Sequence, residues 1–520
     1  MAQDSDPGSS GSTGTPKAHA SVHTGRVIYI AAIAALGGFL FGYDSSVING
    51  ANKAVFYQFQ ITSETLQGFT VAIALLGSAA GAFIGGQLTD RYGRKKVMVT
   101  AAILFLAAGI GQALPIALWD FMFWRLLGGF AIGLAAVVSP MYITEIAPAH
   151  LRGRLSSLFQ LAIVTGIFAT QVINQIIINI VPDTAPAAAP GSDPSLEPVS
   201  ANNELALGLD AWQWMFLCMI VPAVIFWILS LTLPESPRYL VGKDRDEEAR
   251  ATLEQIYDED VTSRLEKIEE SLAGEHKMQL SDIKGRSFGL KPIVWIGIIL
   301  AALQQLAGIN AVFYYSNLIW TAVGFAETEA FLTSTIISVV NVIFTLVAIA
   351  LIDRVGRRPL LLIGSVGMFV TLGILTIVFQ SAPACTEAII NAGGQNGCNI
   401  VADVGNPLLE GSSATMAVIM LNLYVAFFAA TWGPIIWVLL GEMFPNKIRA
   451  AAMSVGVMAN WLANFLVSEF FPTLASLSLG LAYGIFTSFA LVSFFYVLKY
   501  VKETKGVTLE DMDTLEKSEL

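Results

Sequence analysis

Residues 27–48 read VIYIAAIAALGGFLFGYDSSVI, an apolar run long enough to cross a bilayer, which takes about 20 residues as a helix. Such runs recur along the whole chain of 520 residues, of which 55% are hydrophobic and 13% charged. Soluble domains average about 25% charged residues. The sequence therefore predicts an all-α polytopic membrane protein with about twelve transmembrane helices. We expect them near residues 27–48, 66–88, 97–117, 119–143, 156–181, 212–232, 292–321, 328–352, 360–380, 415–440, 450–472 and 478–500.

Basic residues mark one side of the predicted membrane protein. They follow spans 2, 4, 8 and 10, at Arg91, Arg94, Lys95, Lys96, Arg152, Arg154, Arg354, Arg357, Arg358, Lys447 and Arg449. Lys53 is the basic residue expected in the loops of the other side. Because cytoplasmic loops carry such an excess, we expect both termini in the cytoplasm of a multi-pass plasma-membrane protein. The net charge of −11 predicts no nucleic-acid partner.

The chain also contains an internal repeat of loop motifs. GGQLTDRYGRKK (85–96) returns as IALIDRVGRRPL (349–360), YITEIAPAHLRG (142–153) as LLGEMFPNKIRA (439–450), and LPESPRYL (233–240) as VKETKGVTL (501–509). A parallel repeat of six spans predicts two six-helix halves. We therefore expect a disordered cytoplasmic tail over 1–26, six-helix bundles over 27–232 and 292–500, a cytoplasmic helical linker over 233–291 and a cytoplasmic tail over 501–520.

These motifs resemble the sugar porter family of the major facilitator superfamily. The D-R-x-G-R loops are shared by many facilitators, whereas P-E-S-P-R together with QQLAGINAVFYYS (304–316) is more specific to sugar porters. The stretch GGFLFGYDSSVING (37–50) is most similar to bacterial proton-coupled glucose permeases. The resemblance implies a major facilitator fold and import of a hexose, D-glucose in particular, together with protons by alternating access.

A monosaccharide site needs amides for the hydroxyls and aromatic rings for the C–H faces. The resemblance implies sugar contacts from Gln160, Gln304, Gln305, Asn310, Asn341, Trp437 and Asn460, and an aromatic wall from Phe41, Tyr314, Tyr315 and Trp461. Hydrogen bonding between helices is the alternative role for each amide. No ideal helix face holds all the polar residues of span 7, although glycine-adjacent turns could loosen that helix.

Span 10 contains the pair Gly433–Pro434. Proline removes a backbone donor and favours a kink. The resemblance suggests that this hinge closes the sugar site, and a static kink is the alternative.

Asp44 is a carboxyl within span 1, where it costs about 2.5–3.5 kcal/mol on insertion scales. Span 1 runs outward and span 4 inward, so we expect Asp44 and Arg125 at similar depth near the outer ends of neighbouring helices. Pairing would offset much of the cost of each. A structural ion pair is one interpretation. The resemblance favours another, because proton-coupled members carry Asp here and facilitative members carry Asn: Asp44 would accept the proton and Arg125 would tune it.

The positions of the other titratable groups limit which residues are candidates for carrying protons. His19, His23, His150 and His276 all fall in tails or loops, so no histidine relay is expected within the membrane. Asp120 and Glu469 lie near predicted outer span ends, where we expect water to solvate them.

Further charges gather at the cytoplasmic span ends of both halves. They are Asp90, Arg91, Arg94, Glu145, Arg152 and Glu235 in the first half, and Asp353, Arg354, Arg357, Glu442, Arg449 and Glu503 in the second. Arginine binds carboxylates through its planar fork. A network that exists only when the cytoplasmic side is closed would form a gate that stabilises the outward-facing state. Simple topology marking is the alternative.

Other functions remain open at this point. A facilitative uniporter and a proton symporter of xylose, galactose or inositol belong to the same class, and a membrane sugar sensor to another. An enzyme is not expected, since the spans show no nucleophile–base set and no metal cluster, and we expect no cofactor. The expected partners are a monosaccharide, protons and the bilayer, for a monomeric protein.

Cys385 and Cys398 share one outer loop, where they either pair or remain free thiols.

Overall fold

The computed structural model describes residues 22–148, 151–182, 184–258, 260–273, 283–394, 398, 404–445 and 448–504, without the side chains of residues 152, 153, 271, 273, 286, 287, 353 and 450. The predicted tails therefore lie outside the described residues over 1–21 and 505–520. Within the described part, 12 helical segments are long and apolar enough to cross a membrane. The prediction of an all-α polytopic membrane protein is confirmed.

The spans follow one another in two sets of six. The first set is α1 (Thr24–Gln58), α2 (Glu64–Tyr92), α3 (Arg94–Ala113), α4 (Leu118–Ile146), α5 (Arg152–Ile180) and the broken span α6 (Ala211–Leu217) with α7 (Ile220–Thr232). The second set is α11 (Pro292–Leu306) with α12 (Ile309–Ala322), α13 (Glu327–Val355), α14 (Arg357–Ser381), α16 (Ser412–Ala430) with α17 (Trp432–Met443), α18 (Arg449–Leu477) and α19 (Leu479–Tyr500).

The remaining elements lie between the spans. They are the 3-10 helix η1 (Ser200–Asn202), the strands β1 (Glu204–Ala206), β2 (Leu209–Asp210) and β3 (Lys284–Ser287), and the helices α8 (Pro237–Val241), α9 (Asp246–Glu254), α10 (Thr262–Ala273) and α15 (Glu387–Asn391). Strands β1 and β2 pair as an antiparallel hairpin. The loop between α5 and α6 is therefore more ordered than a sequence rich in Pro and Ala suggests.

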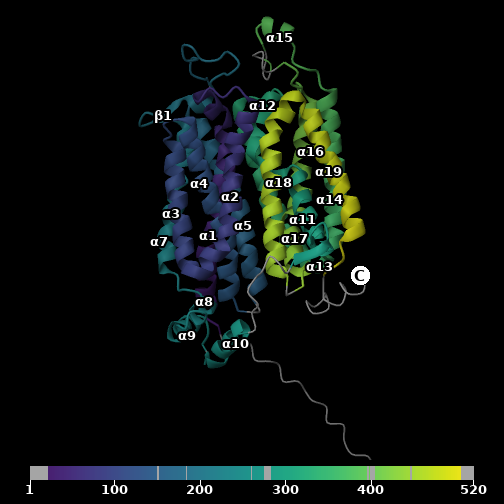
Figure 1. The fold of residues 1–520 in the computed structure, drawn as a ribbon. Helices are drawn as coiled ribbons and strands as arrows, with labels where there is room; N and C mark the ends of the chain where they lie inside the picture. The colour runs from purple at the N-terminus through teal and green to yellow at the C-terminus, as the bar shows by residue number, and fades with distance from the viewer. Residues whose placement is uncertain are drawn as a thin grey trace, which may run out of the picture.

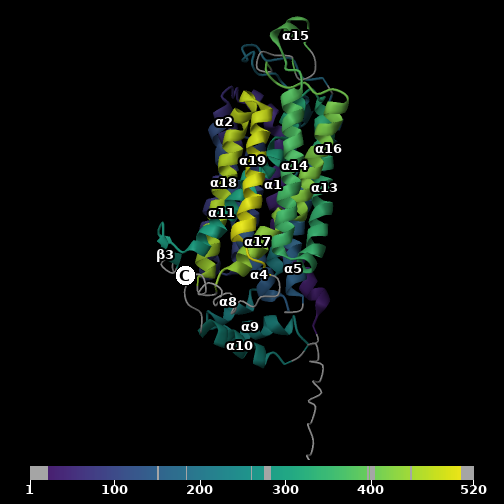
Figure 2. The same ribbon diagram turned by 90° about the vertical axis from the view of Figure 1, so that its right-hand side faces the viewer.

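The two ends of the bundle carry different elements. Figures 1 and 2 show the long helices side by side, with α15 beyond one end and α8, α9 and α10 beyond the other. We call these ends the loop end and the linker end. Helices α1, α12 and α18 all run from the linker end toward the loop end (Figure 1). The two sets of spans meet chiefly where α2 packs on α18, α5 on α13 and α1 on α12.

The first helix is longer than predicted. Helix α1 continues to Gln58, so Asp44 lies near its middle and Lys53 lies within it. The predictions of a carboxyl near the outer helix end and of a basic loop residue are therefore wrong. The sequence after residue 48 is polar enough to look like a loop, but Asn49 and Asn52 are buried and hydrogen-bond to other helices, which keeps this segment inside the bundle.

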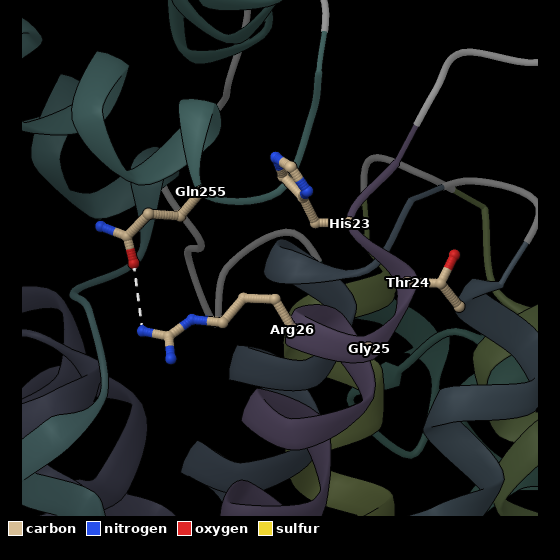
Figure 3. Close-up of a pocket in the computed structure, with 5 residues that line it drawn as sticks. All are labelled: His23, Thr24, Gly25, Arg26 and Gln255. Atoms are coloured by element: carbon tan, nitrogen blue, oxygen red, sulfur yellow. Dashed lines mark hydrogen bonds between the residues drawn. The ribbon is translucent and has the colours of Figure 1, made fainter.

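The start of the chain is attached to the linker. The His23 N–H donates to Ile256 O, and the His23 imidazole lies 2.7 Å from a carboxylate oxygen of Asp258. Figure 3 shows Arg26 donating to Gln255, at 3.3 Å, beside a surface hollow. Residues 22–26, predicted as part of a disordered tail, are thus ordered, because they bond to a small helical unit with its own apolar core.

The loop after α14 answers the question left open about the cysteines. Cys385 and Cys398 form a disulfide, and both are buried in a small cluster with Leu408. Cys218 is free.

Helices α2 and α4 approach so closely that glycine is needed at their contact. A Cβ on Gly129 of α4 would overlap the carbonyl oxygen of Ala74, and one on Gly77 of α2 would overlap that of Leu126. Small residues allow the two backbones to approach closely. Lipid supplies no hydrophobic drive for helix association, so close van der Waals contact between the helices must stabilise their packing.

The α2–α4 contact can be tested by replacing glycine with alanine, because the effect on stability should differ between a packed position and an open one. Alanine favours a helix over glycine by about 1 kcal/mol where space is free. Gly86, also on α2, has no atom near the Cβ that it would gain. We expect Gly129→Ala to lower the midpoint of thermal unfolding in detergent and Gly86→Ala to leave it unchanged or raise it. Equal effects of the two substitutions would contradict the close α2–α4 packing.

Candidate functional site

Amide side chains from three helices form a continuous hydrogen-bonded chain. Asn460 of α18 donates to Gln304 Oε1 of α11 at 2.7 Å. Gln305 donates to Asn460 Oδ1 at 3.1 Å, and Asn310 of α12 donates to Gln305 Oε1 at 2.5 Å. The first three amides are buried and Asn310 is half-buried. The chain therefore ends at an accessible amide, whose Oδ1 accepts no hydrogen bond within the described part of the protein.

A break in span 7 makes this chain possible. Gly308 joins α11 to α12 with φ of +89°, a left-handed conformation that glycine adopts without strain. A Cβ at this position would also overlap the ring of Phe486. Residues five apart do not share a face of a regular helix, yet the break brings Gln305 and Asn310 into contact. This is the loosening of span 7 that its glycine indicated.

Span 10 is also broken, but earlier than predicted. The break lies at Thr431, which separates α16 from α17. Pro434 lies in the first turn of α17, where a missing N–H is tolerated. Gln304 donates to the carbonyl oxygens of Trp432 (2.8 Å) and Gly433 (3.0 Å). The break therefore lies two residues before the predicted Gly433–Pro434 hinge, and Gln304 bonds the start of α17 directly to the amide chain, so a hinge and a static kink both remain open.

Three of the predicted aromatic wall residues lie where the two halves meet. Phe41 of α1 and Trp461 of α18 come from opposite halves, and their ring centroids are 5.7 Å apart. Tyr314 of α12 is buried, and its hydroxyl accepts a hydrogen bond from Asn464 at 3.5 Å. These three predicted wall residues thus lie at or near the contact between the halves.

Tyr315 has a different environment from the other predicted wall residues. It is fully buried, its hydroxyl donates to Ser468 O at 2.7 Å, and its ring stacks on Phe471 at 5.1 Å. These contacts all lie on α18. They indicate that Tyr315 packs within the second half, and its role in an aromatic wall stays a prediction.

The other predicted sugar contacts come from three further helices. Gln160 of α5 and Trp437 of α17 are half-buried, and Asn341 of α13 is buried. None of the three side chains forms a hydrogen bond to another described residue. Their donors and acceptors are therefore available to a ligand, although no contact joins them to the amide chain.

Asp44 and Arg125 lie together, but not as the predicted ion pair. Arg125 donates to the main-chain oxygen of Asp44 at 3.2 Å and to Val71 O at 3.2 Å. The carboxylate Oδ1 instead accepts from Gln112 Nε2 at 3.0 Å, and Arg125 also donates to Gln112 Oε1 at 3.4 Å. Gln112 of α3 thus stands between the two charges. The Asp44 Oδ2 atom is buried and has no hydrogen-bond partner among the described residues.

Gln112 was missed by the sequence analysis, although an amide inside the predicted span 97–117 was a visible signal. Gly128 of α4 is a second missed residue, because a Cβ there would lie 2.8 Å from Asp44 Oδ2 and 3.0 Å from Gln112 Nε2. The space for the carboxyl is therefore created by a missing side chain, which no sequence pattern reveals.

Hydrogen bonds join the two halves on the loop-end side of Asp44. Asn52 donates to Tyr314 O at 2.6 Å, and Asn49 Oδ1 accepts from the Asn317 N–H at 3.0 Å. Asn49 also donates to Gln171 of α5 at 3.3 Å. The first two bonds connect α1 with α12, so the loop end of the bundle is closed in this structure.

The two carboxyls predicted near outer span ends have different environments. Asp120 is half-buried at the start of α4 and accepts from the Ile116 N–H and from Trp124 Nε1. Glu469 is only 8% exposed, so the prediction that water solvates it is wrong. The reason is that α2 of the other half lies directly against this part of α18.

At the linker end, the predicted gate charges form one compact group in the first half. Arg94 binds Glu145 through both fork nitrogens, at 2.9 and 2.8 Å, and lies 3.5 Å from Asp90. Glu235 accepts from the Arg94 and Lys95 N–H groups at the start of α3. A carboxylate there is favoured by the positive end of the helix dipole.

The second half repeats this group. Arg357 binds Glu442 through both fork nitrogens, at 3.0 and 2.8 Å. Glu503 accepts from the Arg357 and Arg358 N–H groups, each at 3.0 Å, at the start of α14. Thr504 adds a hydrogen bond to Glu442 at 2.6 Å.

The remaining predicted gate residues take other positions. Arg91 is exposed and lies over the Tyr92 ring, and Arg449 donates to Phe444 O. Arg354 is exposed, and the side chains of Arg152 and Asp353 lie outside the described residues. The arginine–glutamate pairs given above lie within one half each, so in this conformation they do not tie the halves together.

These pairs lead to a stability prediction. Lysine cannot reproduce the fork of Arg94, so we expect Arg94→Lys to lower the midpoint of thermal unfolding, and Arg357→Lys to lower it similarly. The exposed Arg91 is the matched control, and Arg91→Lys should leave the midpoint unchanged. If all three variants unfold at the wild-type temperature, the arginine–glutamate pairs do not stabilise the halves in which they lie.

Comparison with known proteins places the chain in a family. The family model described as "Sugar (and other) transporter" matches residues 30–515. A glucose transport protein of Synechocystis is 47% identical over 487 residues, covering 94% of this chain and 97% of its own length. The D-xylose-proton symporter of Escherichia coli K12 is 34% identical over 525 residues, covering 94% and 95%.

A solved structure gives the same result. The xylose transporter of E. coli in an inward open conformation matches with a TM-score of 0.73 and 32% identity, covering 94% of this chain and 99% of that one. These matches span nearly the whole chain and agree with its motifs, its 12 candidate spans and its amide-rich centre. The chain therefore belongs to the sugar (and other) transporter family and has the major facilitator fold.

Proposed function

We propose that this protein imports a hexose, D-glucose, together with protons across the plasma membrane. The observation that carries the proposal is the chain of amides that ends at the half-buried Asn310. Such a chain fixes the orientation of each amide, so the last one presents a defined donor and acceptor to a hydroxyl. The likeness to a glucose transport protein at 47% identity supports glucose as the hexose.

The remaining sugar contacts complete this site in the proposal. Gln160, Asn341 and Trp437 supply the unpaired groups, and Phe41 with Trp461 covers the apolar face of the ring. Because Phe41 and Trp461 come from opposite halves, a bound sugar would contact both halves and sense their relative movement. A carrier of this type has no need of a cofactor, and we assign it no enzymatic activity.

Asp44 is the proposed proton acceptor. Its Oδ2 atom has no partner, so a proton can be held there, while Gln112 holds the other oxygen. Burial favours the neutral form of a carboxyl and a nearby guanidinium favours the charged form. Movement of α1 relative to Arg125 would change the balance between the two. The proton and the sugar communicate through α1, which also carries Asn52, the donor to the Tyr314 carbonyl oxygen.

We propose that the linker end, which carries most of the basic loop residues, faces the cytoplasm and that the loop end faces outside, as the positive-inside rule favours. The closed loop end then corresponds to an inward-facing state. The paired charges of each half would keep that half together as one body while the two bodies move. We propose that the protein acts as a monomer in the bilayer.

Xylose symport is the second candidate, because the E. coli relative of that activity matches over nearly the full length. Facilitative uniport is less consistent with a carboxyl at position 44, since a proton acceptor has no use there. A sugar sensor would bind without net flux, so flux measurements distinguish it from all of these.

The proton role is tested by Asp44→Asn in proteoliposomes. We expect wild type to accumulate labelled glucose above equilibrium when the outside is acidic. The reason is that a proton entering down an electrochemical gradient equivalent to 100 mV releases about 2.3 kcal/mol. The variant should only equilibrate glucose, because its amide cannot ionise. Asp120→Asn is the control and should accumulate like wild type. Accumulation by the Asp44 variant would exclude Asp44 as the coupling group.

The sugar role is tested by Asn310→Ala. Loss of this amide removes a hydrogen bond to the sugar, which costs about 1.4 kcal/mol of binding free energy, or roughly tenfold in KM. The exposed Asn179 of α5 provides the control, and Asn179→Ala should keep the wild-type KM for glucose. If Asn310→Ala also keeps it, the amide chain has only a structural role.

A further inference from the structure

Glu469 is a membrane-embedded carboxyl that the proposed transport mechanism does not use. It lies on α18 about two turns before the loop-end terminus at Leu477, and it is 8% exposed. Its Oε2 atom is buried and has no hydrogen-bond partner among the described residues. Burial of a carboxylate without partners is costly. The ionised form of this residue is therefore poorly suited to the position that it occupies here.

The position is the contact between the two halves. A Cβ on Gly68 of α2 would overlap the Glu469 carbonyl oxygen, so the two backbones touch. One turn away, Phe69 and Phe465 pack edge to face with centroids 6.4 Å apart. Because α2 belongs to one half and α18 to the other, opening of the loop end must part them at this point. The carboxyl would then meet water.

The titratable groups around Glu469 do not stabilise a negative charge. On α12 the nearest is Tyr315, whose hydroxyl is already committed to Ser468 O. On α2 it is Glu64, an exposed acid one turn before Gly68. Across the described ranges, no lysine, arginine or histidine forms an ion pair with Glu469. Burial of the Oε2 atom therefore lacks a compensating cation or hydrogen bond among the described residues when the loop end closes.

We propose that Glu469 is a proton-operated lock on the outer gate, so that the loop end closes with this carboxyl protonated and reopens to let it ionise. The proton comes from the external solution on closing and returns there on reopening. It is therefore not transported, unlike the proton on Asp44. An acidic exterior favours closure behind a loaded sugar. The proposal rests on the alternating access proposed above, but not on the identity of the sugar.

The size of the effect is bounded. A single proton linked to closure changes the closed-to-open ratio by at most about tenfold per pH unit. Closure should therefore weaken as external pH rises. Substitution of Glu469 by a residue that cannot ionise should abolish the pH dependence of closure.

The test measures closure directly, without sugar. Spin labels on Leu66→Cys of α2 and Leu477→Cys of α18, both exposed, report the separation of the helix ends in nanodiscs. Cys218→Ser removes the free thiol. Asp44→Asn is included so that Asp44 does not titrate. We expect the closed population of this parent to fall as the external pH rises, and Glu469→Gln to stay closed throughout.

Two further variants make the result decisive. Glu64→Gln removes an exposed carboxyl near the same contact and should follow the parent. Glu469→Met keeps the size of the side chain without a titratable group and should match Glu469→Gln. If the closed population depends on pH in the same way in the parent and in the Glu469 variants, Glu469 is not a proton-operated lock. Failure of glucose transport would instead count against the proposed function, because the distances are read without a substrate.

Discussion

Lipid offers no hydrogen-bond partner, so every polar group that this chain carries into the bilayer must be satisfied inside the bundle. The broken spans follow from this constraint. The break at Gly308 lets Gln305 reach Asn310, and the break at Thr431 lets Gln304 reach carbonyl oxygens of α17. Each break thus exchanges regular helix for a buried polar chain that ends at one accessible amide. That amide is where the proposed sugar site begins.

The same constraint separates two kinds of contact. Within each half, glycines bring backbones together and arginine–glutamate forks join the helix ends at the linker end. Between the halves, α2 also lies against α18 at Gly68, but the other contacts include the amide of Asn52 on Tyr314 O and the ring of Phe41 beside that of Trp461. In the proposed cycle each half moves as one body, and the interface between the halves reopens. This is the mechanical requirement for the proposed transport cycle.

Two carboxyls are among the buried groups that lack a hydrogen-bond partner in the described residues, and both lie where movement is proposed. Asp44 keeps one oxygen unpaired next to Gln112, and Glu469 keeps one unpaired against the opposite half. A static protein would gain stability by replacing either group with an apolar one. Their retention is understandable if each is neutral in one state and charged in another, one moving a proton inward and the other only exchanging it with the outside.

The sequence alone determined the spans, their repeat in two sets of six, and the residue types of the site. Apolar length and loop motifs are local features, and a bilayer turns them directly into helices. Only the tertiary structure decided which side chains meet. It placed Asp44 in mid-helix, put Gln112 between Asp44 and Arg125, turned Tyr315 into the second half and buried Glu469. The reason is physical, because burial and hydrogen bonding depend on which helix lies opposite, and hydropathy along one segment contains no information about its neighbours.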